Sequence, residues 1–334
     1  MRIDFNRLEC GSAFAISSET TRTDGGAELV SVPDVLFLPN ALDQGQSICV
    51  AQQRTVPVEA ILDCWNLGFL QRGRDQLPQP RYADDFEADR REGPACILGS
   101  VFTRNFGHWT EELLKVAALE QANIGCTYVI PTLPAFARAS LSFLGVEDER
   151  VAVVDSPTVF ARALFVDAVS HQNIAQHPQR LGLLRELVAE RLGDAGGEGR
   201  KRLWLERREM VGNAGRLANP EEVHALVDSY GFELVDMATL SFPDQLRTIS
   251  QASVIAGVHG SQFVHAQFMP KHSTVIECFS PAYVNPSVLE ICRALGHSYH
   301  QVVARCNLVV PYTLGRDCQV DCEHLSLILE SLQD

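Results

Sequence analysis

No run of about 18 consecutive apolar residues occurs in this 334-residue sequence, so a membrane-spanning helix is not expected. The opening residues, MRIDFNRLECGS, lack the apolar core of a secretory signal peptide. The ten cysteines are scattered through apolar runs, without the spacing of a disulfide scaffold. We therefore expect free thiols and a location in a reducing cytoplasm, with peripheral attachment to the inner membrane left open.

Positive charge is also scarce, since 28 Lys and Arg residues face 42 Asp and Glu residues and the formal net charge is −14. Such an acidic surface repels phosphate backbones, so nucleic acid is not an expected partner. No Gly-x-Gly-x-x-Gly turn follows a predicted strand, which argues against a dinucleotide oxidoreductase. Cys318, Cys322 and His324 have the wrong spacing for a zinc site, and we predict neither a metal nor a cofactor.

The sequence does contain a regular alternation of apolar strands and amphipathic helices, clearest after residue 95. Alternation of this kind indicates parallel sheets joined by right-handed crossovers. We predict an α/β fold of two facing, doubly wound, Rossmann-like domains, since the length suits two domains of roughly 150 residues. The expected parts are a domain over 1–192, a Gly-rich linker over 193–199, a second domain over 200–315 and a closing C-terminal helix within 316–334.

Strands are predicted at 35–38, 48–51, 95–99, 127–130, 151–154, 159–166, 202–206, 232–235, 253–257 and 274–278. Helices are predicted at about 106–122, 135–143, 178–192, 220–230, 241–251, 262–268, 285–295 and 321–332. Most of residues 1–94 gives no clear pattern. Ligands of doubly wound sheets bind beyond the carboxyl ends of the strands, and this rule selects four segments. They are 206–208, 258–261, 277–280 and the helix entry 106–108.

The turn His259-Gly260-Ser261 follows one strand and begins a helix. Unpaired N–H groups and the helix dipole make such a turn a seat for a diphosphate. Gly260 permits close approach of the backbone, and Ser261 is able to cap the helix and to donate to an oxygen. The same residues also suit an ordinary tight turn with a capping serine.

Arginines follow the first strand of the second half, at Arg207, Arg208 and Arg216. Their charge and fork of donors suit phosphate, although a solvated basic loop has the same composition. Glu277 lies near the end of an apolar strand, where an unpaired carboxylate is costly. It is expected either to accept hydrogen bonds from ribose hydroxyls or to pair with a nearby arginine.

His108 and Glu112 are spaced i and i+4 at the start of one predicted helix, so they share a face. Either side chain is able to act as a general base for an acceptor hydroxyl if its pKa is tuned toward neutrality. The alternatives are a packing histidine beside Trp109 and a first-turn acid that complements the helix dipole.

Together these residues resemble glycosyltransferase family 61 over about 100–282. The resemblance is carried by 106–109 with Glu112, by Arg207, Arg216, Asn219 and Glu222, and by the runs 240–245, 252–261, 268–270 and 275–277. It implies GT-B architecture and an inverting, metal-independent transfer from a nucleotide-diphosphate sugar, with UDP-sugars favoured. The acceptor would be a glycan or lipid-linked hydroxyl, as in bacterial surface-polysaccharide synthesis.

The resemblance also implies roles for single residues. Arg207, His259, Gly260, Ser261 and Glu277 would surround the diphosphate, while His108 and Glu112 would serve the acceptor. From their positions in the sequence we also predict that Arg208, Arg216 and Gln262 bind the nucleotide sugar.

The chain departs from the family pattern His-Gly-Ala-Gly-Leu-Thr-Asn at Gln262, which replaces the second glycine, and at His265, which replaces the asparagine. Gln262 is expected either to narrow the phosphate-binding turn or to supply new hydrogen-bond donors to the sugar nucleotide. The function predicted is a glycosyltransferase. A non-catalytic nucleotide-sugar-binding or scaffold protein of the same fold and a sugar-nucleotide epimerase are the alternatives.

Overall fold

The computed structural model of the protein describes residues 9–10, 19–22, 28–39, 48–51, 54–56, 87–98, 105–166, 171, 174–193, 200–207, 217–280, 284–304 and 318–333. The chain divides into two compact units, which are described separately below. Unit 1 consists of Met1–Ser170 and Gln179–Val188, and unit 2 of His171–Pro178 and Ala189–Asp334. The domain boundaries expected from the sequence stay a prediction, because most of the Gly-rich segment lies outside the described residues.

Unit 1 contains a mixed sheet whose nine described strands follow the order β1-β5-β4-β3-β9-β6-β7-β8, with β2 paired to β3. The strands are β1 (Glu9–Cys10), β2 (Glu19–Arg22), β3 (Glu28–Leu38), β4 (Ile48–Ala51), β5 (Arg54–Val56), β6 (Asp89–Ile97), β7 (Thr127–Ile130), β8 (Val151–Val153) and β9 (Thr158–Val166). Strands β9, β6, β7 and β8 pair in parallel, but β3 is antiparallel to β2, β4 and β9. The prediction of a doubly wound, parallel first domain is therefore wrong for this part of the chain.

The α-helices of unit 1 match their predicted positions. They are α3 (Phe106–Gln121), α4 (Ala135–Phe143) and most of α5 (Pro178–Leu192), and a short 3-10 helix that was not predicted, η3 (Asp148–Arg150), lies between α4 and α5 in the chain. Asn105 caps α3, since its side chain accepts from the N–H of Gly107 at 2.8 Å. Trp109 is fully buried and donates to Ser140 Oγ at 2.8 Å, which fixes α3 against α4.

Unit 2 contains a five-stranded sheet in which every pair of neighbouring strands is parallel, in the order β11-β10-β12-β13-β14. The strands are β10 (Lys201–Leu205), β11 (Phe232–Val235), β12 (Ala252–Val258), β13 (Thr274–Phe279) and β14 (Ser298–Val303). The next two strands of the chain, β11 and β12, pair with opposite edges of β10, so the strand order reverses between β10 and β12. This reversal is the topological switch point, where doubly wound sheets bind ligands. The doubly wound prediction is confirmed for this unit.

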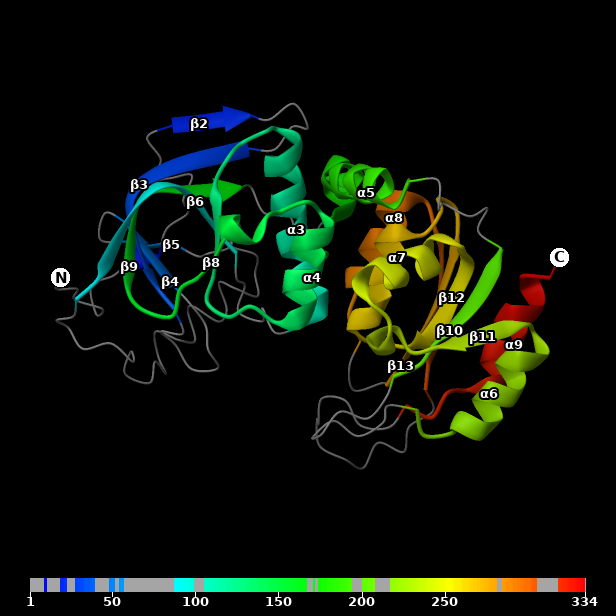
Figure 1. Ribbon diagram of the computed structural model, residues 1–334. Helices are drawn as coiled ribbons and strands as arrows, with labels where there is room; N and C mark the ends of the chain where they lie inside the picture. The colour runs from blue at the N-terminus through cyan, green and yellow to red at the C-terminus, as the bar shows by residue number, and fades with distance from the viewer. Residues whose placement is uncertain are drawn as a thin grey trace. The chain divides into compact units, whose positions relative to one another are not determined.

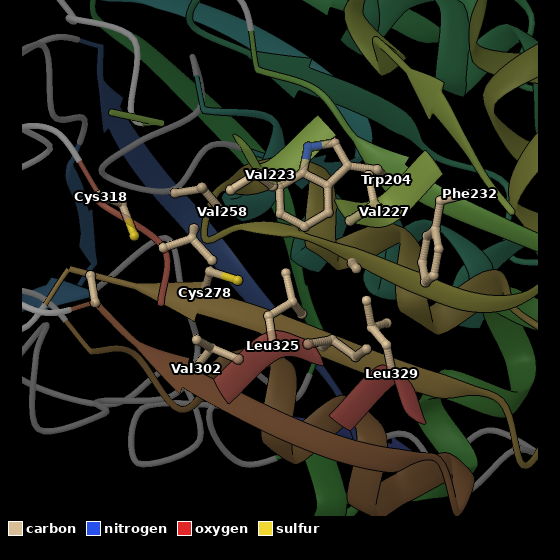
Figure 2. Packing of buried hydrophobic residues seen from close by; sticks show 14 of the residues in the cluster. Trp204, Val223, Val227, Phe232, Val258, Cys278, Val302, Cys318, Leu325 and Leu329 are labelled. Carbon is tan, nitrogen blue, oxygen red and sulfur yellow. The ribbon is translucent and has the colours of Figure 1, made fainter. Parts of the chain in front are cut away.

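Helices cover both faces of this sheet (Figure 1). The helical elements are η4 (Ile174–Gln176), α6 (Pro220–Ser229), η6 (Met237–Thr239), α7 (Phe242–Ser250), η7 (Ser261–Phe268), α8 (Ser287–Leu295) and α9 (Cys322–Ser331). Helices α6 and α9 lie on one face, and α7 and α8 on the other. Figure 2 shows Leu325 and Leu329 of α9 packed with Trp204 and Val302 of the sheet. The predicted C-terminal helix thus completes the core of unit 2.

The positions of the strands and α-helices after residue 105 follow the sequence predictions closely. The predictions lack strand β14 and the short 3-10 helices η3, η4 and η6. No helix in the described part of the chain is long and apolar enough to cross a membrane. Among the described side chains, the cysteines at 49, 96, 126, 278, 292, 318 and 322 are free thiols, as expected.

Candidate functional site

The carboxyl ends of β10 and β12 form the switch point of unit 2, and they bring Arg207 to His259. The two strands pair in register up to Leu205 and Gly257. Arg207 follows β10, and its Nη1 donates to the carbonyl oxygen of His259 at 3.2 Å. The sequence rule on strand ends therefore placed these two residues together correctly.

Two glycines allow this close approach. A Cβ on Gly260 would lie 2.6 Å from Arg207 Nη1, so the guanidinium occupies the space that a side chain would need. A Cβ on Gly257 would lie 2.8 Å from the carbonyl oxygen of Leu205, which is backbone and cannot move aside. Gly257 thus lets β10 and β12 pair, and Gly260 lets Arg207 lie over the turn.

The helix that follows the turn is η7, and Gly260 is its N-cap residue. Ser261 is the first residue of η7 and no side chain caps the helix, so the prediction that Ser261 caps it is wrong. The N–H of Phe263 donates to the Gly260 carbonyl at 3.0 Å, which is the i→i+3 pattern of a 3-10 helix. The backbone around Gly260 and Ser261 nevertheless begins a helical element at the end of β12, as predicted.

Glu277 lies in β13 and is fully buried, with both carboxylate oxygens in hydrogen bonds. Oε1 lies 2.5 Å from His259 Nδ1, and Oε2 accepts from the hydroxyl of Tyr299 at 2.8 Å. The His259 ring also stacks on Phe279, with ring centroids 4.8 Å apart. Burial, the charge of Glu277 and their hydrogen bond together raise the pKa of Tyr299, which keeps its hydroxyl a donor. The partners of Glu277 are thus a histidine and a tyrosine, not the arginine that the sequence suggested as one alternative.

Gln262 and His265, the two departures from the family pattern, are joined in one hydrogen-bonded chain. Gln262 Nε2 donates to the carbonyl oxygen of Leu205 at 3.1 Å, which links η7 to the end of β10. His265 Nδ1 lies 2.8 Å from the Gln262 carbonyl oxygen, and its Nε2 lies 3.1 Å from Gln245 Oε1. Burial lowers the pKa of His265 to about 4. The Gln262 side chain therefore connects η7 to the end of β10 at the switch point.

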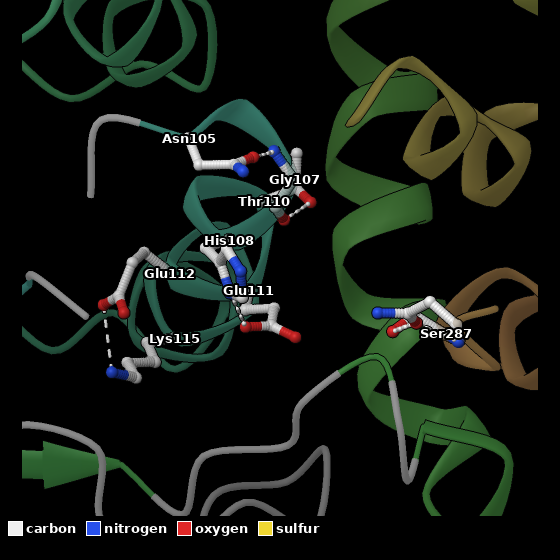
Figure 3. A network of polar contacts seen from close by, with 9 residues as sticks. Asn105, Gly107, His108, Thr110, Glu111, Glu112, Lys115 and Ser287 are labelled. Atoms are coloured by element: carbon white, nitrogen blue, oxygen red, sulfur yellow. Dashed lines mark hydrogen bonds and ion pairs between the residues drawn. The ribbon is translucent and has the colours of Figure 1, made fainter. Parts of the chain in front are cut away.

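The predicted catalytic pair lies in unit 1, at the start of α3, but its members do not pair with each other. His108 Nδ1 lies 3.5 Å from Glu111 Oε2, and 43 % of the His108 side chain is exposed. Glu112 is 1 % exposed and accepts from Lys115 Nζ at 2.9 Å. Figure 3 shows the Glu112 and Lys115 side chains directed to one side of the helix and the His108 and Glu111 pair to another. The expected His108–Glu112 interaction is therefore replaced by two separate pairs.

Two predicted arginines, Arg208 and Arg216, lie outside the described residues. Tyr299 is the site residue that the sequence reasoning missed, and the run 298–303 with its aromatic and β-branched residues was the available signal for a strand. No cluster of three or more His, Cys, Asp or Glu side chains able to hold a metal ion occurs within the described ranges.

Comparisons with known proteins agree on one family. The family model described as Glycosyltransferase 61 matches residues 106–276, about half of the chain. Two animal proteins named protein O-linked-mannose β-1,4-N-acetylglucosaminyltransferase 2 match over 52 residues. The protein from Canis lupus familiaris is 44 % identical and that from Mus musculus 42 % identical. Each match covers 16 % of this chain and 9 % of the relative, so the chain matches only a small part of these longer proteins.

Proposed function

This chain belongs to glycosyltransferase family 61, and on that premise we propose that it transfers a sugar from a nucleotide-diphosphate donor to an acceptor hydroxyl. The transfer proceeds with inversion and without a metal ion. The donor is held by unit 2, at the carboxyl ends of β10 and β12. The product belongs to a surface polysaccharide or another glycan.

The observation that carries this proposal is the meeting of Arg207, His259 and Gly260 at the switch point. A diphosphate needs positive charge and N–H donors at close range, because its own charge increases as it leaves the sugar. The guanidinium supplies a permanent charge and several donors in a fixed fork. Gly260 lets this guanidinium lie directly over the turn, since it carries no side chain.

For the acceptor, we propose His108 as the general base. Its ring is partly exposed, and the nearby Glu111 carboxylate favours the orientation in which Nδ1 faces it. Glu112, the other candidate from the sequence, is buried and pairs with Lys115, which suits a role in holding α3. The proton of the acceptor hydroxyl passes to His108 as the oxygen attacks the anomeric carbon and the nucleoside diphosphate leaves.

The names of the relatives support a choice of donor to test first. Their printed names describe transfer of N-acetylglucosamine to O-linked mannose. We therefore propose a UDP-sugar donor and place an N-acetylhexosamine first among the sugars to test, with a glycan or lipid-linked acceptor.

The test is a thermal-shift screen with UDP-, GDP-, CMP- and dTDP-sugars, followed by product analysis for each stabilising donor. A bound donor raises the unfolding midpoint by mass action. Glycosylated acceptor with released nucleotide supports the proposal. Binding without any turnover supports a scaffold instead, and an epimerised sugar nucleotide without acceptor supports an epimerase.

The role of His108 is tested with His108→Asn, which is expected to lower kcat about 100-fold or more while the donor still binds. The control is His324→Asn, at an exposed position on α9. A His108→Asn variant that transfers at the wild-type rate would remove His108 from the mechanism.

A further inference from the structure

We propose that Tyr299 is a positioning residue, which acts through Glu277 to fix the orientation and tautomer of His259. The inference rests on the proposed function for what His259 contacts, namely the diphosphate of the donor. It also gives Glu277 a different role from ribose binding, since both of its oxygens serve the histidine and the tyrosine.

The register of the sheet explains why these side chains meet. His259 directly follows β12, and its N–H donates to the carbonyl oxygen of Cys278, so the ring lies opposite Phe279 and stacks on it. Gly257 is the direct neighbour of Glu277 on β12 and has no side chain. The carboxylate of Glu277 therefore reaches diagonally along β12 to His259.

Tyr299 approaches the same carboxylate from the other side. It lies in β14 opposite Val275, which is two residues before Glu277 and on the same face of the sheet. A diagonal neighbour at this offset is within reach of a long aromatic side chain. Tyr299 of β14, Glu277 of β13 and His259, which follows β12, are thus joined by two consecutive hydrogen bonds.

The energetics favour a fixed arrangement. A buried carboxylate is costly unless donors satisfy it, and Glu277 is fully buried with one donor on each oxygen. An ionised carboxylate only accepts, so the nitrogen that faces it, His259 Nδ1, carries a hydrogen. This contact fixes the tautomer of the ring, in which Nδ1 carries the hydrogen and Nε2 carries the lone pair.

A ring that is stacked on one side and hydrogen-bonded at Nδ1 loses little freedom when a ligand arrives. Preorganised donors stabilise developing charge best, because they need no reorganisation during the reaction. Tyr299 and Glu277 therefore hold the His259 imidazole in one defined position, in the turn that contacts Arg207.

The first readout is a double-mutant cycle on kcat/KM with Tyr299→Phe and Glu277→Gln. Tyr299→Phe removes one oxygen and is expected to lower kcat/KM about 10-fold, and Glu277→Gln about 100-fold. If Tyr299 acts through Glu277, the double variant loses no more than Glu277→Gln alone. Losses that multiply in the double variant would overturn the inference. If Glu277→Gln does not fold, the cycle is closed with His259→Asn instead.

The second readout does not need activity. The ¹⁵N shifts of the His259 ring report its tautomer, and the signals are assigned by their absence in His259→Asn. The wild-type ring is expected to carry its hydrogen at Nδ1, and Tyr299→Phe to show a mixture of tautomers. An unchanged tautomer in Tyr299→Phe would overturn the inference, even if no nucleotide sugar is turned over and the proposed function fails.

The chain offers a matched control in Tyr128, whose hydroxyl donates to Glu120 Oε1 at 2.7 Å in unit 1. Tyr128→Phe removes the same kind of tyrosine–carboxylate hydrogen bond from a pair in which the carboxylate contacts Arg150 and not His259. It is expected to leave both kcat/KM and the His259 signals unchanged. Equal effects of Tyr128→Phe and Tyr299→Phe would mean that a general loss of stability, and not positioning, is being measured.

Discussion

His265 is expected to make the fold sensitive to acid, and His265→Asn to remove that sensitivity. Two influences oppose each other at this ring. Both ring nitrogens lie beside oxygens, of Gln262 and Gln245, an arrangement that the doubly protonated ring satisfies best. Gln245 cannot turn its amide around, because its Nε2 donates to the carbonyl oxygens of Met237 and Leu240. Burial favours the neutral ring and lowers the pKa of His265 to about 4.

The sign and size follow from linkage. The pKa of His265 is about 4 when folded, below the ordinary value of 6.5. Above about pH 6.5 the ring is neutral in both states and adds no pH dependence. Between about pH 6.5 and 4 the unfolded chain takes up a proton that the folded chain does not, so stability falls as the pH falls. The full loss is about 3 kcal/mol, of which about 2 kcal/mol is reached near pH 5.

The assay is urea unfolding of wild type and His265→Asn at about pH 7.5 and pH 5, followed by circular dichroism. Asparagine keeps a donor and an acceptor at the position. The difference in the free energy of unfolding between the two proteins at the higher pH gives the cost of the changed hydrogen bonds. The contributions of other titrating groups cancel, because both proteins contain them. The variant is expected to lose about 2 kcal/mol less than wild type on acidification. Equal losses, or a wild type that gains relative to the variant in acid, would refute the dominance of burial.

The remaining predictions concern packing and chemistry. Glu112→Gln is expected to lower the free energy of unfolding by about 3 kcal/mol, since it removes the carboxylate charge that pairs with the buried Lys115 ammonium. Adding Lys115→Met is expected to restore that stability, as urea titrations will show. Gly257→Ala is expected to lower the free energy of unfolding by about 2 kcal/mol, because its Cβ would clash with the carbonyl oxygen of Leu205. A nearly normal unfolding midpoint would contradict this prediction. Gly260→Ala is expected to spare stability but to weaken donor binding roughly tenfold by displacing Arg207, which calorimetry measures. Transfer is expected to continue in EDTA, and a loss that Mn²⁺ or Mg²⁺ restores would contradict metal independence.

The alternation of strands and helices predicts nearly all of unit 2, because each buried strand is a short apolar run between clear helix signals. Unit 1 is less regular. Its strand β3 contains Pro33 and then Asp34 with a positive φ of 51°, and this break hides an eleven-residue strand. Antiparallel neighbours such as β2 and β5 are short and lack a strong hairpin signal, so the mixed sheet could not be read from the sequence.

The candidate site divides in the same way. The strand-end rule finds Arg207, His259 and Gly260, because these residues directly follow parallel strands. Tyr299 escapes the rule, since it is the second residue of β14 and reaches the site diagonally. Helical spacing allows His108 to pair with Glu111 at i+3 or with Glu112 at i+4. Glu112 is buried and pairs with Lys115, so His108 pairs with Glu111 instead.

The central claim is that the switch point beside Arg207 binds the diphosphate of the donor, and calorimetric titration with UDP tests it most directly. The matched control is Arg202, on the same strand but at its amino end, where it donates to the carbonyl oxygens of Tyr230 and Leu332. Arg207→Gln is expected to weaken UDP binding about 10- to 100-fold, the value of a charge-assisted hydrogen bond, while Arg202→Gln leaves it unchanged. Unchanged binding in Arg207→Gln, or equal weakening in both variants, would contradict the account.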